Sequence, residues 1–386
     1  MPAHSHPGKT AWLSVWLTGF DHIKMKNKLK IIDVYIIRKF LGTFFYAITL
    51  LAIIIIIFDI SEKIDDFLEK DAPLHAIIFD YYLNFLPYFI NLFSALFTFV
   101  AVIFFTSKLA SNTEIIAILN SGISFWRLLR PYMISALILA LLSLLLSNFV
   151  IPITNRRMVD FERKYIKSTA HSENMNIHMQ VSPGTFIYVE SYNAQAKVGY
   201  RFSLEKMDAK GLSSKFAADY ITWDSIQHKW KADMFVEREI DGMKEKITRG
   251  KSKLLKIPLE PKDFTLNLDD TKVMNYWDLR NFIEREKMRG SPTVAKFEVE
   301  KYKRIAFPFA TLVLTIIGFA LSSRKARGGI GMHLGLGLSI SFAFILFMQI
   351  STVFATFGSL PPIIAVWIPN IIFGLLGIYL LRIAPK

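Results

Sequence analysis

Long stretches of uncharged, apolar residues constrain this chain more than any other feature of its sequence. A helix needs roughly 20 mostly apolar residues to cross about 30 Å of hydrocarbon. Five blocks contain no Asp, Glu, Lys or Arg and approach or exceed that length: Leu41–Phe58, Tyr81–Ser107, Pro131–Ile153, Ile305–Ser323 and Leu334–Leu381. The last block has room for two helices, and its segment Gly358–Pro362 carries the glycine and prolines that end one helix and start another. The sequence therefore predicts six membrane-spanning helices.

Between the third and fourth predicted spans the composition changes. Hydrophobic residues make up 52% of the whole chain, whereas residues 154–304 are rich in charged side chains. Short β-forming runs separated by turn signals lie in this insert: Thr185–Val189, Tyr200–Leu204, Phe216–Trp223, Lys229–Glu237 and Ile247–Ile257. Such runs favour an antiparallel sandwich or an open jelly roll. The predicted fold class is an α-helical polytopic membrane protein with six transmembrane helices and an inserted, jellyroll-like antiparallel β domain.

The predicted domains follow from these boundaries. Residues 25–160 hold the first three spans, 161–290 the β domain and 291–386 the last three spans. Residues 1–24 are expected to be an extension upstream of a natural start at Met25, with a short interfacial tail as the alternative.

Basic residues in the short loops set the predicted orientation. They precede the first span, separate the second from the third and the fourth from the fifth, and follow the last, whereas acidic residues follow the first span. Lysine and arginine in short loops stay in the cytoplasm, so both termini are expected there and the β domain on the opposite side. Much of the net charge of +14 is explained in this way, and nucleic-acid binding is not expected.

The residue types also exclude several chemistries. The chain has no cysteine, which excludes disulfides, thiolate metal sites and cysteine nucleophiles. No histidine spacing suits a metal, and we find no catalytic grouping of side chains in the spans. We therefore expect no metal, no catalytic residue and no enzymatic activity in this chain; a lipid-modifying hydrolase is the less favoured alternative.

A short helix is predicted in the cytoplasmic loop at residues 111–124. Ser111 is the expected cap, Glu114 lies in the first turn and Gly122 ends the helix. Its apolar stripe consists of Ile115, Ile118 and Leu119. Two readings remain open: an interfacial helix resting on lipid, or a docking helix for a cytoplasmic partner.

Three segments resemble the LptF/LptG permeases of lipopolysaccharide export. Glu114–Ser124 resembles the family's coupling helix, Leu360–Asn370 with Gly377–Leu381 is similar to its last span, and Asp33–Phe40 resembles its first helix. The likeness runs from about Met25 to the end of the chain. The order of three spans, β insert and three spans fits as a whole.

The resemblance implies a permease subunit of an ABC-type exporter in the bacterial inner membrane. Such a subunit extracts lipopolysaccharide and passes it through its periplasmic β domain to a periplasmic bridge. Implied partners are a dimeric LptB-like ABC ATPase, a second LptF/LptG-type permease chain, periplasmic LptC/LptA-like jellyroll proteins, lipopolysaccharide and membrane lipids. ATP and magnesium would bind to the ATPase, so no cofactor is expected in this chain. By the same likeness, the ATPase-coupling residues are Glu114, Ile115, Ile118, Leu119 and Gly122.

Three basic residues near the outer membrane surface are candidate contacts for the anionic headgroup of the lipid. Lys63 follows the first span, and Lys303 and Arg304 precede the fourth. The alternative for each is ordinary snorkelling to the interface. Asp59 lies one turn before Lys63 on the same helix face, so an ion pair between the two is expected.

Glycines in the fifth span suggest close helix packing. Gly331 and Gly335, together with Gly329 and Gly337, have the small-residue spacing that allows it. The resemblance implies a lateral gate between this span and the first, and static packing is the alternative. An envelope-assembly scaffold without transport also remains open, as does the choice between an F-like and a G-like role.

Overall fold

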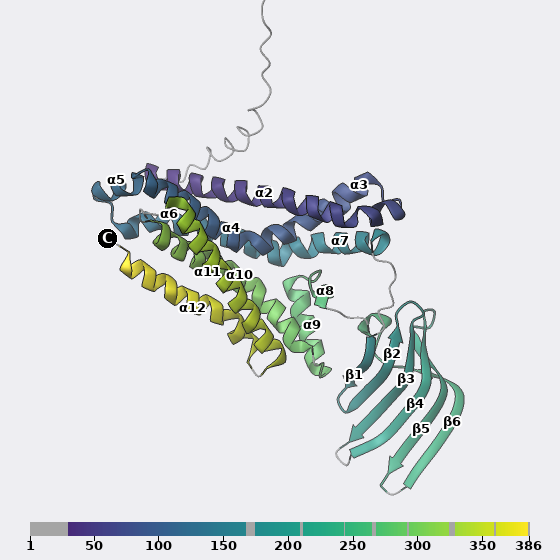
Figure 1. Cartoon of the computed structure of the whole chain (residues 1–386). Helices are drawn as coiled ribbons and strands as arrows, with labels where there is room; N and C mark the ends of the chain where they lie inside the picture. The colour runs from purple at the N-terminus through teal and green to yellow at the C-terminus, as the bar shows by residue number, and fades with distance from the viewer. Residues whose placement is uncertain are drawn as a thin grey trace, which may run out of the picture.

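A computed structural model describes most of the chain. The described residues are 30–166, 174–208, 211–242, 244–264, 268–291, 293–323, 329–358 and 360–384. The predicted extension at residues 1–24 lies outside them. Figure 1 shows a helical bundle and a separate β-sheet, joined near one end of the bundle.

Among the described residues, six helices are long and apolar enough to cross a membrane, which confirms the predicted number. They span Ile31–Glu69, Leu74–Ser111, Phe125–Tyr165, Val294–Ser322, Gly331–Phe357 and Pro362–Ile383. The first, fourth and sixth correspond to α2, α10 and α12, and α11 (Gly329–Phe357) contains the fifth. The second is made of α3 (Leu74–Ala76), η1 (Ile77–Tyr82) and α4 (Leu83–Ser111), and the third of α6 (Phe125–Leu145), η2 (Leu146–Val150) and α7 (Ile151–Tyr165).

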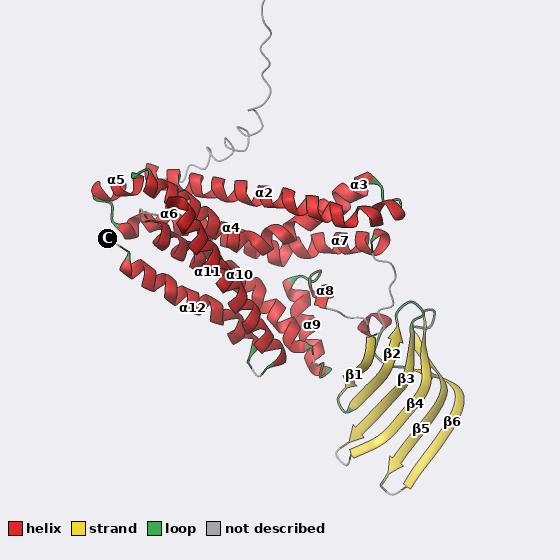
Figure 2. Ribbon diagram, in the orientation of Figure 1, coloured by secondary structure: helices red, strands yellow, loops and turns green. Residues whose placement is uncertain are grey.

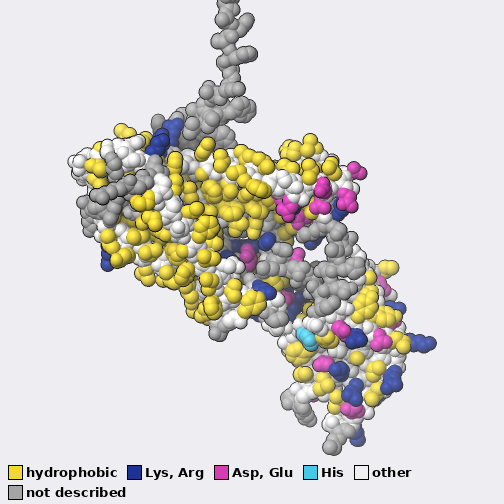
Figure 3. All heavy atoms as spheres, viewed as in Figure 1, with side chains coloured by type: hydrophobic (Ala, Val, Ile, Leu, Met, Phe, Trp, Pro, Cys, Tyr) yellow, Lys and Arg dark blue, Asp and Glu magenta, His cyan; other side chains and the backbone are white. Residues whose placement is uncertain are grey.

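The central helix of the bundle is α10. It packs against α4, α6, α11 and α12, and 61% of its most apolar window is buried, against 22% for α2. Because α2 packs mainly on α4 and α6, its outer face stays apolar and open. The surface over the helices is accordingly dominated by hydrophobic side chains, while charges gather on the sheet and at one end of the bundle (Figure 3).

The bundle has two distinct ends. One carries the short helix α5 (Glu114–Asn120) and the chain's C-terminus, and we call it the loop end. The other leads through α8 (Leu268–Thr271) and α9 (Tyr276–Met288) to the β-sheet, and we call it the sheet end. The basic short loops predict that the loop end is cytoplasmic and that the sheet end lies on the opposite side of the membrane.

The described part of the insert folds into one antiparallel sheet of six strands in the order β1-β2-β3-β4-β5-β6 (Figure 2). The strands are β1 (Asn174–Ser182), β2 (Thr185–Asn193), β3 (Val198–Asp208), β4 (Gly211–Asp224), β5 (Lys229–Asp241) and β6 (Lys244–Leu255). The inserted, open antiparallel β domain is thus confirmed, and the described residues contain no second, facing sheet. β1 was not among the predicted strands.

One face of the sheet holds a single aromatic-rich core. Tyr192 stacks on Phe264, and Phe216 stacks on Phe235. Trp230 is fully buried and donates its indole N–H to the carbonyl of Leu259 at 2.9 Å. The hydroxyl of Tyr192 is buried without a hydrogen-bond partner among the described residues, and burial raises the pKa of Tyr192 to about 12.

A transverse crease crosses this sheet. Each of β2 to β5 buries alternate residues, and then places two consecutive residues away from the core before the alternation resumes. The pairing register aligns these breaks in one row across neighbouring strands. In that row Asn176, Arg201 and Met234, on β1, β3 and β5, have φ values of 56°, 49° and 54°. A left-handed residue of this kind turns a strand's side chains by one position, which accounts for the break in β3 and β5. β2 and β4 show the same two-residue break without such a residue.

The joint between sheet and bundle is polar. The guanidinium of Arg289, just after α9, lies 3.2 Å from Asp263 and 3.0 Å from Glu286. Its carbonyl accepts a hydrogen bond of 2.8 Å from the backbone N–H of Gln180 in β1. Lys287 pairs with Glu298 of α10 at 2.7 Å. These contacts attach the edge of the sheet to the helices that lead into α10.

Candidate functional site

The helix α5 starts and ends at identifiable residues. It begins at Glu114, preceded by Thr113 with a φ of 61° and no side-chain cap. Ser111 is therefore not its cap: this residue ends α4, and its hydroxyl donates to the carbonyl of Ser107 at 2.7 Å. The prediction failed because α4 continues to Ser111 rather than ending with its apolar residues. Gly122, with a φ of 85°, follows the last turn as predicted, because such a backbone favours glycine.

The apolar stripe of α5 faces the bundle. Ile115 is 2% exposed within the core formed by α2, α4, α6 and α10, and Ile118 and Leu119 are half-buried against it. The stripe therefore holds α5 to its own chain. The face left open carries Ile116, and Trp126 at the start of α6 is also exposed. Contact between the stripe residues and a partner protein stays a prediction. A partner that approaches α5 from the solvent meets the open face with Ile116 before it meets the stripe.

Glu114 is hydrogen-bonded within the chain. One carboxylate oxygen accepts a hydrogen bond from the Tyr35 hydroxyl of α2 at 3.3 Å, and the other accepts one from the Asn112 amide at 3.2 Å. Both bonds are exposed and long. They orient the carboxylate but hold it weakly, because hydrogen bonds of this length contribute little energy. Another hydrogen-bond donor could therefore replace Tyr35 or Asn112.

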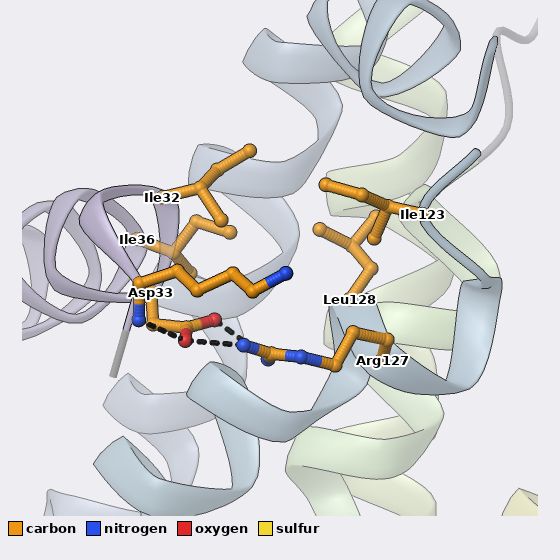
Figure 4. A pocket seen from close by; sticks show the side chains of 7 residues that line it. Ile32, Asp33, Ile36, Ile123, Arg127 and Leu128 are labelled. Carbon is orange, nitrogen blue, oxygen red and sulfur yellow. Dashed lines mark hydrogen bonds and ion pairs between the residues drawn. The ribbon is translucent and has the colours of Figure 1, made fainter. Parts of the chain in front are cut away.

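A partly buried ion pair beside α5 was not predicted from the sequence. The guanidinium of Arg127, in the first turn of α6, donates to both oxygens of Asp33 on α2, at 2.7 and 2.5 Å. Figure 4 shows the two side chains meeting at a pocket that Ile32, Ile36, Ile123 and Leu128 help to line. In the sequence, Arg127 is one of the basic residues between the second and third spans that set the predicted orientation. A sequence signal existed, since Asp33 is the lone acid in a basic segment.

At the sheet end, Lys63 pairs with Asp59 as predicted, at 2.8 Å. The carboxylate of Asp59 also accepts hydrogen bonds from the hydroxyls of Tyr81 and Tyr82, at 3.2 and 3.1 Å. Lys63 additionally contacts the Tyr81 hydroxyl. Consecutive tyrosines reach one carboxylate because they end the π-helical segment η1, whose wider turn changes the direction of successive side chains. Lys63 is thus neutralised by its own chain.

The two adjacent basic residues of α10 differ in their surroundings. Arg304 is 6% exposed, and its guanidinium donates to the carbonyls of Thr271 at 2.7 Å and Met274 at 2.8 Å. It therefore fastens the α8–α9 connection to α10, a structural role that the sequence did not indicate. Lys303 is half-buried and makes no hydrogen bond or ion pair with another described residue, although the charge of Glu300 acts on it.

The glycines of α11 divide into two groups. A Cβ at Gly331 or Gly335 would meet nothing within 4 Å, whereas one at Gly337 would collide with Ile103 of α4. Close packing within the chain is therefore found at Gly337, against α4 rather than α2. Gly331 and Gly335 lie on an open face, and their packing at a gate stays a prediction. Gly329 belongs to α11, but its surroundings lie outside the described side chains.

Comparison with protein families gives one decisive match. The sequence model described as lipopolysaccharide export system permease LptF/LptG matches residues 34–383. The chain belongs to this family. The match begins in the first turns of α2 and ends with α12, so the LptF/LptG region includes the loop end, the sheet end and the β domain. No curated protein matches the chain significantly. Membership of the LptF/LptG family makes the chain a transporter subunit rather than an enzyme.

Proposed function

We propose that this chain is a permease subunit of an ABC-type exporter that extracts lipopolysaccharide from the bacterial inner membrane. The observation that carries the proposal is the family match over residues 34–383, on a chain with six candidate membrane spans and an inserted sheet. In this proposal both termini are cytoplasmic and the sheet passes the lipid to a periplasmic bridge of LptC/LptA-like jellyroll proteins. A second LptF/LptG-type permease chain completes the lipid cavity.

The basic residues at the sheet end have separate roles in this proposal. Lys303 supplies a headgroup contact, because it is half-buried and makes no hydrogen bond or ion pair with another described residue. Lys63 becomes available only when a phosphate displaces it from Asp59, which keeps the hydrogen bonds of Tyr81 and Tyr82. Arg304 maintains the joint to the β domain and has its guanidinium occupied by two carbonyls.

The loop end is the proposed docking site of a dimeric LptB-like ATPase, which binds ATP and magnesium. α5 is held rigidly by Ile115 and presents Glu114 and the open face with Ile116 to the cytoplasm. A basic groove residue of the ATPase would replace Tyr35 and Asn112 as the partner of Glu114, since a charge-assisted bond is stronger than the two long neutral ones.

Co-purification from native membranes tests the function directly. Proteins and lipids that remain bound to the tagged chain are identified together by mass spectrometry. Recovery of an ATPase subunit with a lipid A-containing glycolipid is expected. Recovery of neither, from membranes in which the chain is folded and abundant, would contradict the transport role and favour the scaffold.

A further inference from the structure

The first turn of α2 is tied to the start of α6 by a bond that the proposed transport cycle does not yet use. The Asp33 carboxylate is 1% exposed and accepts both guanidinium bonds of Arg127 together with the backbone N–H of Lys30 at 2.9 Å. Figure 4 shows that the carboxylate and the guanidinium point toward each other across the space between the two helices. A bidentate, charge-assisted pair of this kind fixes orientation as well as distance.

A second, weaker link joins the same turn of α2 to α5. It consists of the exposed hydrogen bond of 3.3 Å between Tyr35 and Glu114. The two links therefore differ in kind. The Asp33–Arg127 pair is short and has one fully buried partner, whereas the Tyr35–Glu114 bond is long and open to a competing partner.

Beyond Ile48, α2 is held less tightly, whereas its residues Ile36, Phe40, Phe44 and Ile48 are buried in the core shared with α4 and α6. Its most apolar window is only 22% buried, and its middle shares a shallow apolar pocket with α4, lined by Ile48, Leu51, Ala52, Ile55, Phe89 and Ile90. Polar bonds return at the sheet end, where Asp59 meets Tyr81 and Tyr82. The loosely packed stretch of α2 thus lies between Ile48 and Asp59, and the part before it is attached to α6 by the ion pair and by buried apolar contacts, so we expect that part to follow α6.

We propose that Asp33 and Arg127 are positioning residues that make the first turn of α2 move together with the start of α6 when a partner docks at α5. On docking, Glu114 exchanges Tyr35 for the partner, while the buried pair persists and carries the displacement into α2. The identity of that partner as an ATPase rests on the proposed function. The mechanical link between α2 and α6 rests on the geometry of the chain alone.

Asp33→Asn is the variant of choice, because the amide keeps the shape of the side chain and removes the charge that holds Arg127. Arg127→Lys is a second variant that keeps the charge and loses the two-pronged geometry. Arg130→Gln is the matched control, since Arg130 is exposed and lies one turn further along α6. Each variant is reconstituted with its partner subunits in lipid bilayers. The measurements are complex yield, lipid transferred per ATP hydrolysed, and the distance between spin labels on α2 and α6.

The chain suits the distance measurement because it has no cysteine, so labels attach only where cysteine is introduced. Ile31→Cys and Leu137→Cys place them on exposed positions, 93% and 50% accessible. We expect one narrow distance distribution for the parent protein and Arg130→Gln, and a broadened one for Asp33→Asn and Arg127→Lys. Lipid transferred per ATP should fall about fivefold or more in both pair variants, the usual scale of coupling between sites.

Several results would overturn the proposal. Pair variants with the parent's distance distribution would show that the ion pair does not fix α2. A transport loss that only follows complex yield would assign the pair to folding alone. If the parent complex itself transfers no lipid with ATP, the proposed function fails, and the spin-label distances still decide whether Asp33 positions α2.

Discussion

Adjacent cations of α10 offer the sharpest test of which basic residues at the sheet end hold the fold and which are free for a ligand. Arg304→Ala removes two hydrogen bonds to backbone carbonyls, a buried one of 2.7 Å to Thr271 and a partly buried one of 2.8 Å to Met274. A hydrogen bond from a charged donor contributes about 1.5–3 kcal/mol, so the loss amounts to about 3–6 kcal/mol. Lys303→Ala, its matched control, removes a side chain with the same charge and no such bond, and should leave stability nearly unchanged.

Thermal unfolding followed by tryptophan fluorescence ranks these variants, because the chain has seven tryptophans. The midpoint should fall clearly for Arg304→Ala, fall less for Arg304→Lys, and stay at the parent value for Lys303→Ala. Binding of a phosphorylated glycolipid should show the reverse preference, with the larger loss in Lys303→Ala. Equal midpoints for Arg304→Ala and Lys303→Ala would refute the division of roles, as would a purely lipid-binding defect in Arg304→Ala.

Three further predictions concern single positions. Met234→Gly should leave the stability of the sheet unchanged or raise it by up to about 1 kcal/mol, because the left-handed backbone at Met234 favours glycine. Met234→Val should lower the stability of the sheet, and hydrogen exchange of the β5 amides distinguishes the two variants. Tyr192→Phe should stabilise the sheet by about 1 kcal/mol, since it removes a buried hydroxyl without a described partner, and faster exchange in β2 would argue against this. Gly122→Ala should lower the stability of the end of α5 by about 1 kcal/mol and reduce the amount of ATPase that co-purifies with the chain. Gly122→Asn should restore part of that ATPase binding. Full retention of the ATPase by Gly122→Ala would count against α5 as the docking element.

The number of spans could be predicted because the thickness of hydrocarbon sets a length that composition alone reveals. The helices extend well past the uncharged blocks, however, and α2 runs from Ile31 to Glu69. Charged residues mark where the lipid-facing part of a helix stops, but the helix itself can continue beyond them. Most strands followed from β-forming runs and turns. β1 did not, because Asn174–Ser182 mixes polar residues with few β-branched ones.

The candidate sites were predictable only where partners are close in sequence. Asp59 and Lys63 lie one turn apart, and their pairing follows from helical spacing. The Asp33–Arg127 pair joins residues 94 positions apart, and the carbonyls that occupy Arg304 come from a connection whose path depends on the whole fold. The sequence identified basic residues near the outer surface but did not reveal which of them the chain itself neutralises.

The crease in the sheet has an evolutionary consequence. Removing one residue from the crease in β3 alone would turn half of that strand's inward side chains outward, while β2 and β4 kept theirs on the core face. The row that contains Asn176, Arg201 and Met234 should therefore be inherited as a unit. Relatives of this chain should therefore have the two-residue break in all of these strands or in none of them. Insertions and deletions of single residues should accumulate in the turns instead.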